Sequence, residues 1–218
     1  MAEAVLITTL NNVFDRKLAE AFVREGYIVF AIGARAVEGV ALLPEVLDRA
    51  SAIVEKEAGK LDIYIELSDE RSPADRFTVR DGLNEKVIRE LYEGNVLRPM
   101  ARLEAFINLL DAGGGKRLCF IASTEASINE ARGVDGYGYA LSKAAMSNFY
   151  QMISNKLTPS GYTFRVFDPM RKEVAPEAAA EGAFNYFTRR RGTEGANPLR
   201  DDEARLVFRD AQAREHAW

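Results

Sequence analysis

The sequence YALSK places Tyr139 and Lys143 four residues apart in a segment with helical spacing. Residues at this spacing lie on one face of a helix. A lysine ammonium near a phenol favours the phenolate and lowers the pKa of the tyrosine. Such a phenol can exchange a proton with an alcohol or a carbonyl group near neutral pH. The pair alone is a weak signal, because a surface tyrosine and a solvated lysine at this spacing are common.

Ser123 adds weight to this pair through its position. It follows the apolar stretch RLCFIA, which is typical of a buried strand, and the helix with Tyr139 comes next along the chain. In parallel α/β proteins, ligands bind beyond the carboxyl ends of the strands. A hydroxyl at that place can bond the same substrate oxygen as the phenol. The three residues together predict an acid–base site.

Short apolar runs alternate with amphipathic helical segments along the chain, and the runs are apolar on both faces. This pattern predicts an α/β fold with a doubly wound parallel sheet and helices on both faces, in one domain covering residues 1–218. The predicted strands are 4–8, 27–32, 61–67, 117–123 and 162–169, with a possible strand at 39–43 and a hairpin at 206–218. The predicted helices are 12–26, 44–59, 84–115 with Pro99 as an internal boundary, 137–157 and 176–190.

Composition excludes several classes of function. The chain has 218 residues and a formal net charge of −4, and its one basic cluster is residues 189–191, so we expect no nucleic-acid binding. The single cysteine, Cys119, excludes an internal disulfide, and the single histidine, His216, argues against a metal site or a histidine-based triad. No long apolar run or leader is present, so we expect no membrane segment and a cytoplasmic protein.

Several segments, in this order, resemble the short-chain dehydrogenases/reductases: VLITTLNNVFDRKLAEAFVREGYIVFAIGAR, LDIYIELSD, EGNVLRP, FIAS, YALSK and RVFDPMRKEV. The resemblance covers roughly residues 4–187 and implies a Rossmann-like fold and oxidoreduction with NAD or NADP. It implies that Tyr139 is the acid–base group and that Ser123 orients the substrate oxygen. It also implies that Lys143 binds the nicotinamide ribose and that Asn95 holds a water in a proton relay.

The first turn departs from that family. Where the family has Thr-Gly-x-x-x-Gly-x-Gly, this chain has TTLNNVFD, so Thr9, Val13 and Asp15 fill the glycine positions. Those glycines let the backbone approach the pyrophosphate, and Asp15 places negative charge where a phosphate should sit. Asn12 and Asp15 are instead typical of a helix cap. The sequence therefore predicts that NAD or NADP binding is weak or absent.

Other segments depart in the same direction. The family's Asn-Asn-Ala-Gly stretch is residues 66–69 here, ELSD, and the region between Ala36 and Lys60 has room for only one clear helix. Little chain separates Met170 from the next helix, so we expect an open site. Thr8 and Arg35 stay candidate cofactor contacts beside Tyr139 and Lys143, because a basic residue after the second strand favours the 2′-phosphate of NADP.

The main interpretation is a protein of this fold that retains the catalytic residues but binds NAD or NADP weakly or not at all. Three other functions stay open. The first is an active NAD- or NADP-dependent oxidoreductase with altered cofactor contacts. The second is a non-catalytic subunit of a homo- or hetero-oligomer, paired with an active homologue through the apolar faces of residues 103–110 and 146–153. The third is a tyrosine-based lyase similar to the halohydrin dehalogenases, which carry arginine at the position of Lys143. The partner is thus a small-molecule substrate or a homologous subunit.

Overall fold

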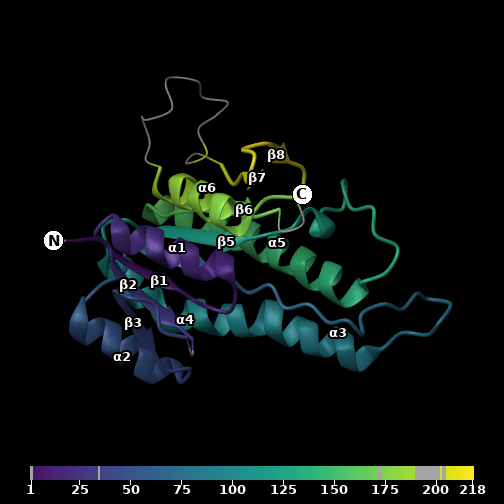
Figure 1. The fold of residues 1–218 in the computed structure, drawn as a ribbon, viewed down its shortest axis with the longest axis horizontal. Helices are drawn as coiled ribbons and strands as arrows, with labels where there is room; N and C mark the ends of the chain where they lie inside the picture. The colour runs from purple at the N-terminus through teal and green to yellow at the C-terminus, as the bar shows by residue number, and fades with distance from the viewer. Residues whose placement is uncertain (1, 34, 171–172, 190–201, 203–204) are drawn as a thin grey trace.

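The computed structural model describes residues 2–33, 35–170, 173–189, 202 and 205–218. Within these ranges eight strands form one sheet in the order β3-β2-β1-β4-β5-β6-β7-β8. Figure 1 shows β3 at one end of this sheet and the β7–β8 hairpin at the other. All neighbouring strands are parallel except β7 and β8. The predicted doubly wound parallel sheet and the predicted C-terminal hairpin are confirmed. The strands are β1 (Ala4–Ile7), β2 (Ile28–Ile32), β3 (Val40–Leu43), β4 (Ile63–Glu66), β5 (Arg117–Ile121), β6 (Thr163–Asp168), β7 (Phe208–Asp210) and β8 (Glu215–His216).

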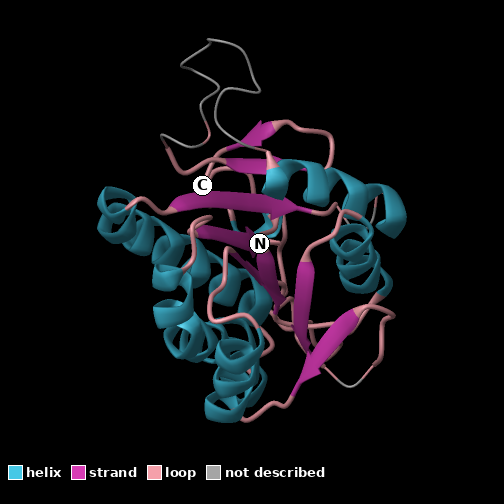
Figure 2. Ribbon diagram, turned by 90° about the vertical axis from the view of Figure 1, so that its left-hand side faces the viewer, coloured by secondary structure: helices cyan, strands magenta, loops and turns pink. Residues whose placement is uncertain are grey.

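Helices cover both faces of the twisted sheet, as Figure 2 shows. Helices α1 (Val13–Arg24) and α6 (Pro176–Thr188) pack on one face, where Phe22 and Phe187 belong to one hydrophobic core. Helices α2 (Leu47–Glu57), α4 (Arg98–Ala112) and α5 (Tyr137–Leu157) pack on the other face, around Phe106 and Met146. The strands are buried between these two layers because both of their faces are apolar.

The connection between β2 and β3 is unusually short. Residues 33–39 join the two parallel strands, and the described part of this connection contains no helix. Parallel strands normally need a crossover of a dozen or more residues, usually with a helix. The possible strand predicted at 39–43 is present as β3. Because the connection before it is so short, the predicted shortening of the chain after the second strand is also confirmed.

The long helical tract is divided where Pro99 predicts a boundary. Helix α3 (Glu85–Tyr92) continues into a π-helical turn, η1 (Glu93–Leu97), before α4 begins. Proline has no amide hydrogen, so Pro99 cannot donate the α-helical hydrogen bond to the carbonyl of Asn95, four residues earlier. Wide turns of this kind are frequent at functional sites, and this one contains Asn95.

Some predicted boundaries are wrong by a few residues. The second helix begins at Leu47 rather than at Pro44, and the strand expected to reach Ser123 ends at Ile121. Ser123 instead caps a short 3-10 helix, η2 (Thr124–Ala126), through a bond from the Glu125 amide to its hydroxyl. A second such turn, η3 (Thr158–Ser160), follows α5. Residues 190 and 191 of the basic cluster lie outside the described residues.

The helix faces predicted for a dimer contact serve mainly as core. Leu103, Phe106, Leu110 and Met146 are buried inside the hydrophobic core, whereas Met152 is exposed. Burial of this kind is the ordinary use of an apolar stripe at helical spacing. No helix in the described ranges is both long and apolar enough to cross a membrane.

Candidate functional site

The turn between β1 and α1 satisfies its own polar groups. Asn12 is the N-cap of α1, and its side-chain oxygen accepts a hydrogen bond from the Asp15 amide at 3.0 Å. The Asp15 carboxylate accepts bonds from the Asn11 amide at 2.9 Å and from the Thr9 hydroxyl at 2.8 Å. Asp15 is fully buried. The predicted capping arrangement is therefore confirmed, and the amides of Asn11 and Asp15 are bonded within the turn.

A buried carboxylate lies beside this turn at the end of β4. Glu66 accepts hydrogen bonds from the hydroxyls of Thr8 and Tyr64, both at 2.9 Å. A guanidinium nitrogen of Arg102 lies 3.5 Å from the same carboxylate. The Thr8 oxygen in turn accepts a bond from the Leu67 amide at 3.0 Å. Thr8, a predicted cofactor contact, thus uses its hydroxyl to join β1 to β4.

A small cavity of about 210 Å³ lies where β1 and β4 end. Its lining includes four carboxylates, Asp15, Glu45, Asp69 and Glu70, against two guanidiniums, Arg98 and Arg102. The cavity is therefore net negative. Arg35, the predicted contact to a 2′-phosphate, is exposed beyond β2 and does not line it.

Tyr139 and Lys143 project from α5 toward the end of β4. The Tyr139 hydroxyl donates a hydrogen bond to the Asp69 carboxylate at 2.6 Å. The Lys143 ammonium donates to the carbonyls of Ser68 and Ile121 at 2.9 and 2.8 Å, and lies 3.8 Å from Asp69. Both α5 side chains are nearly fully buried. They are brought together as predicted, but through a carboxylate that the sequence did not single out.

The pKa of Tyr139 is raised well above its ordinary value, so the predicted lowering by Lys143 is wrong. Burial of the phenol is the largest cause, and the negative charge of Asp69 adds to it. The Arg71 guanidinium, 3.7 Å from the centre of the ring, and the Ser123 hydroxyl act in the opposite direction without cancelling these effects. The sequence pattern missed Asp69, which favours the protonated phenol.

Asn95 and Ser123 complete the predicted group of four. Asn95 is almost fully buried, and its side chain makes two hydrogen bonds with the backbone of Glu70, at 2.7 and 2.8 Å. It also donates to the Ser142 hydroxyl at 3.1 Å. Asn95 therefore fixes the loop after β4 to α5, and its role in a water relay stays a prediction. Ser123 lines the same cavity as Tyr139.

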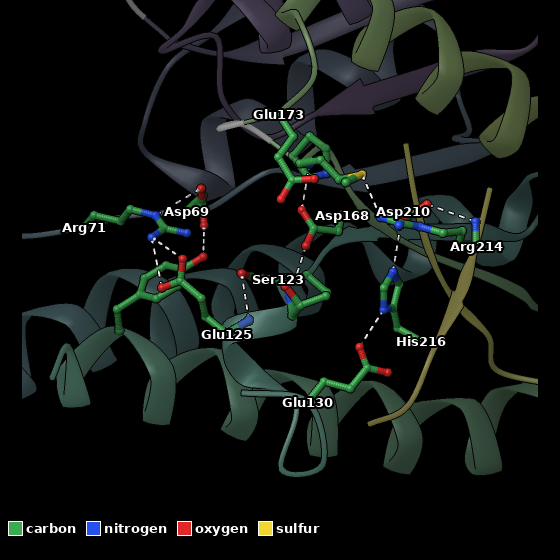
Figure 3. A pocket seen from close by; sticks show the side chains of 15 residues that line it. Asp69, Arg71, Ser123, Glu125, Glu130, Asp168, Glu173, Asp210, Arg214 and His216 are labelled. Carbon is green, nitrogen blue, oxygen red and sulfur yellow. Dashed lines mark hydrogen bonds and ion pairs between the residues drawn. The ribbon is translucent and has the colours of Figure 1, made fainter. Parts of the chain in front are cut away.

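That cavity has a volume of about 530 Å³ and lies beyond the carboxyl ends of the strands from β4 to β7. Figure 3 shows Asp69 and Arg71 on one side and the side chains of the β7–β8 hairpin on the other, with Ser123 and Asp168 between them. A volume of this size suits a small organic molecule. The lining residues are Asp69, Arg71, Ala122, Ser123, Thr124, Glu125, Glu130, Tyr139, Asp168, Pro169, Met170, Glu173, Asp210, Arg214 and His216.

Sequence reasoning missed the contribution of the C-terminal hairpin. Asp210, Arg214 and His216 form one wall of the cavity, on a side that we expected to be open. The sequence analysis gives His216 no role in the site, because it is the single histidine and lies in the tail EHAW. The apolar residues on both sides of the turn near residue 212 did predict the hairpin, but its place beside β6 depends on tertiary structure.

Asp168 also lines the larger cavity, although no pattern in the sequence pointed to it. Its carboxylate accepts hydrogen bonds from the amides of Thr124 and Met170, at 3.0 and 2.8 Å. Burial raises its pKa, although these two bonds act in the opposite direction. Across the described ranges, no group of three or more histidine, cysteine, aspartate or glutamate side chains is arranged to hold a metal ion.

The parallel sheet order, the switch point between β1 and β4, and the arrangement of Ser123, Tyr139 and Lys143 define a Rossmann-like α/β protein with the fold of the short-chain dehydrogenases/reductases. No protein-family model matches the sequence, and no curated protein matches it. Solved structures do match. Carbonyl reductase Sniffer of D. melanogaster is 13% identical with a TM-score of 0.81, and the alignment covers 100% of both chains.

Two further matching structures contain a bound nucleotide. A carbonyl reductase from Pseudomonas aeruginosa PAO1 in complex with NADP is 19% identical, with a TM-score of 0.75, over 99% of this chain and 100% of that chain. An NADPH-bound carbonyl reductase from chicken fatty liver is 16% identical, with a TM-score of 0.77, over 100% of this chain and 99% of that chain. At these identities the likeness establishes the fold.

Proposed function

We propose that this chain keeps the fold of the short-chain dehydrogenases/reductases but fills the dinucleotide site with its own side chains, so that it binds NAD or NADP weakly or not at all. The observation that carries the proposal is the buried Asp15 carboxylate at the start of α1. A pyrophosphate held there needs the amides and the positive end of the helix dipole. Asp15 and Asn12 already use them. The residues present do not fit a pyrophosphate at this turn.

Asp69 supports the same proposal at the other end of the site. The resemblance implies that a ribose contacts Lys143, yet here the lysine bonds two carbonyls and lies near Asp69. Tyr139 donates its hydrogen to the same carboxylate. A ribose would have to displace a buried carboxylate from both partners, and breaking such contacts is costly.

The protein then acts through the larger cavity, which is a binding site for a small molecule. Ser123 and Tyr139 lie at its wall and can bond a polar substrate group. The alternative function is an NADP-dependent carbonyl reductase. Two observations favour it: the chain has the four residues Asn95, Ser123, Tyr139 and Lys143, and similar structures bind NADP or NADPH. A non-catalytic role beside an active homologue, in a homo- or hetero-oligomer, is a further possibility, favoured by the side chains that fill the dinucleotide site.

Titration with NADH and NADPH, followed by nicotinamide fluorescence and by thermal shift, tests the proposal. A ligand that binds only the folded state raises its apparent stability. We expect no saturable binding at millimolar cofactor. Saturable binding to the wild-type protein would contradict the proposal, and its loss in a Lys143→Met variant that is still folded would support the reductase.

Two variants locate the cause if the wild-type protein does not bind. Asp69→Gly removes the carboxylate beside Tyr139 and leaves the α1 cap intact. The triple variant Thr9→Gly, Val13→Gly and Asp15→Gly restores the family's turn. We expect NADPH affinity to appear when both changes are combined, with circular dichroism as the check on folding. No gain in a folded combined variant would place the exclusion in the shortened β2–β3 region instead.

A further inference from the structure

The C-terminal hairpin contacts the loop before α5 through one histidine. The Nδ1 atom of His216 lies 2.7 Å from a Glu130 oxygen, and Nε2 lies 2.8 Å from an Asp210 oxygen. Figure 3 shows the ring held between these two carboxylates at the cavity wall. The Glu130 carboxylate also accepts the Ala217 amide at 2.7 Å. These contacts join β7, β8 and the loop that contains Glu130.

The geometry requires a particular protonation state. A neutral imidazole carries a hydrogen on one nitrogen only, whereas the imidazolium donates from both. With carboxylates on both sides, only the imidazolium makes two hydrogen bonds. A neutral ring would turn one lone pair toward a carboxylate, which is repulsive.

We propose that His216 is a protonation-dependent latch, which as an imidazolium closes the cavity between the C-terminal hairpin and the loop containing Glu130, and as a neutral ring releases that loop. This inference goes beyond the proposed function and does not depend on whether a dinucleotide binds.

Burial decides which of the two contacts is released. The Asp210 side chain is 1% exposed, and the Glu130 side chain is 34% exposed. Asp210 also accepts hydrogen bonds from Arg214, so it is fixed in the hairpin. Water can solvate Glu130 after release, whereas the buried Asp210 carboxylate has no water to replace the hydrogen bond from His216, and losing a hydrogen bond at a buried charge is costly. The neutral ring therefore keeps its single hydrogen on Asp210.

The surrounding charges set the direction of the titration. Partial burial disfavours the charged ring, but the hydrogen bonds to Asp210 and Glu130 outweigh it, so the pKa of His216 is raised from its ordinary 6.5. The latch therefore contributes its full stabilisation below pH 6.5, and this is lost as the pH rises through the higher folded-state value. The other charged groups facing this region are Arg132 on the loop, Asp168 at the end of β6, Glu173, and Arg209, Arg214 and Glu215 on the hairpin.

The chain provides its own probes, because it contains one histidine and one tryptophan. The Trp218 ring lies 5.6 Å from the Phe208 ring, which itself lies 5.4 Å from the His216 ring. Proton NMR of the histidine ring reports its protonation. Acrylamide quenching of tryptophan fluorescence reports whether the loop containing Glu130 still covers the last residues, because the Asn129 side chain donates a hydrogen bond to the Trp218 carbonyl at 2.8 Å. Both are measured on the full chain between pH 5 and pH 9.

We expect the histidine to titrate above 6.5 and tryptophan quenching to rise through the same transition. Glu130→Gln should lower the histidine midpoint and shrink the quenching step, whereas Glu125→Gln, which alters the carboxylate that pairs with Arg71 on the other side of the same cavity, should change neither. His216→Gln should give pH-independent quenching at the high value. A wild-type midpoint at the ordinary value, or quenching that does not follow the histidine, would overturn the latch. Glu130→Gln decides the matter alone if His216→Gln does not fold.

Discussion

The two cavities at the carboxyl edge of the sheet differ in how their polar groups are used. At the smaller cavity, where β1 and β4 end, Asp15 in the lining and Glu66 beside it are buried and bonded to hydroxyls and amides of the same region. In the larger cavity, Ser123 and Tyr139 face a volume of about 530 Å³. The same edge of one sheet thus contains a region closed by its own carboxylates and a region with room for a ligand. Fold alone does not tell which region is used.

Lys143 joins the two regions, and its replacement should have the largest effect. Lys143→Met leaves the carbonyls of Ser68 and Ile121 without their donor and removes the cation beside Asp69. Loss of one partner of a buried charged contact costs about 3–5 kcal/mol. We expect a loss of this size in the free energy of unfolding, measured by urea denaturation. Lys156→Met, at an exposed site on the same helix, is the control and should change little.

Asp15 tests whether the smaller cavity is closed for structural reasons. Asp15→Ala leaves the Asn11 amide and the Thr9 hydroxyl without their acceptor, which should lower the free energy of unfolding by about 2 kcal/mol. Asp48→Ala, in the exposed first turn of α2, removes only a dipole interaction and should cost about 0.5 kcal/mol. Equal losses in the two variants would break the comparison, because Asp15 would then be an ordinary surface acid.

The phenol of Tyr139 predicts a pH dependence at the larger cavity. Its folded-state pKa is raised, mainly by burial, so it stabilises the fold fully below pH 10 and loses this contribution as the pH rises further. One such group changes the free energy of unfolding by at most about 1.4 kcal/mol for each pH unit. Tyr139→Phe should therefore flatten the alkaline loss of stability. Asp69→Asn should make that loss smaller, because removing the carboxylate brings the folded-state pKa closer to the unfolded one. A phenol already ionised at neutral pH by ultraviolet absorbance would restore the acid–base interpretation from the sequence.

The smallest effect is expected at the rim. Arg71 lies over the Tyr139 ring and bonds Glu125 at 3.1 Å, and both charged side chains are more than two-fifths exposed. Exposed pairs of this kind contribute about 0–1 kcal/mol. Glu125→Gln should change the midpoint of urea unfolding only slightly. A larger change would show that the pair of Arg71 and Glu125, at the edge of the larger cavity, contributes to the stability of the fold.

Most of the fold could be predicted from local patterns. Apolar runs alternating with amphipathic segments fix the type of each element, because burial on both faces of a strand and on one face of a helix follows from side-chain periodicity. The cap at Asn12 and Asp15 could also be read locally, since its hydrogen bonds join residues three or four apart. Pro99 marked a helix boundary for an equally local reason.

The site could be predicted only in part. The sequence selected Tyr139, Lys143, Ser123 and Asn95, but it did not select Asp69, which is 70 residues from Tyr139 along the chain and 2.6 Å from its hydroxyl. A pKa depends on every charge within a few ångströms, so a pairwise spacing of four could not give even its direction. The sequence also could not show that His216 lies between the carboxylates of Glu130 and Asp210, because Glu130 is far from it along the chain.

The sequence by itself determined the order and type of the elements, the glycine-free turn and its cap, because these depend on neighbours along the chain. The tertiary structure alone decided that Asp69 meets Tyr139 and Lys143, and that the last residues form a wall of the cavity. Both results depend on which strands lie side by side. The sheet order that sets β4 beside β5 and β7 beside β6 brings together charges that are far apart in the sequence.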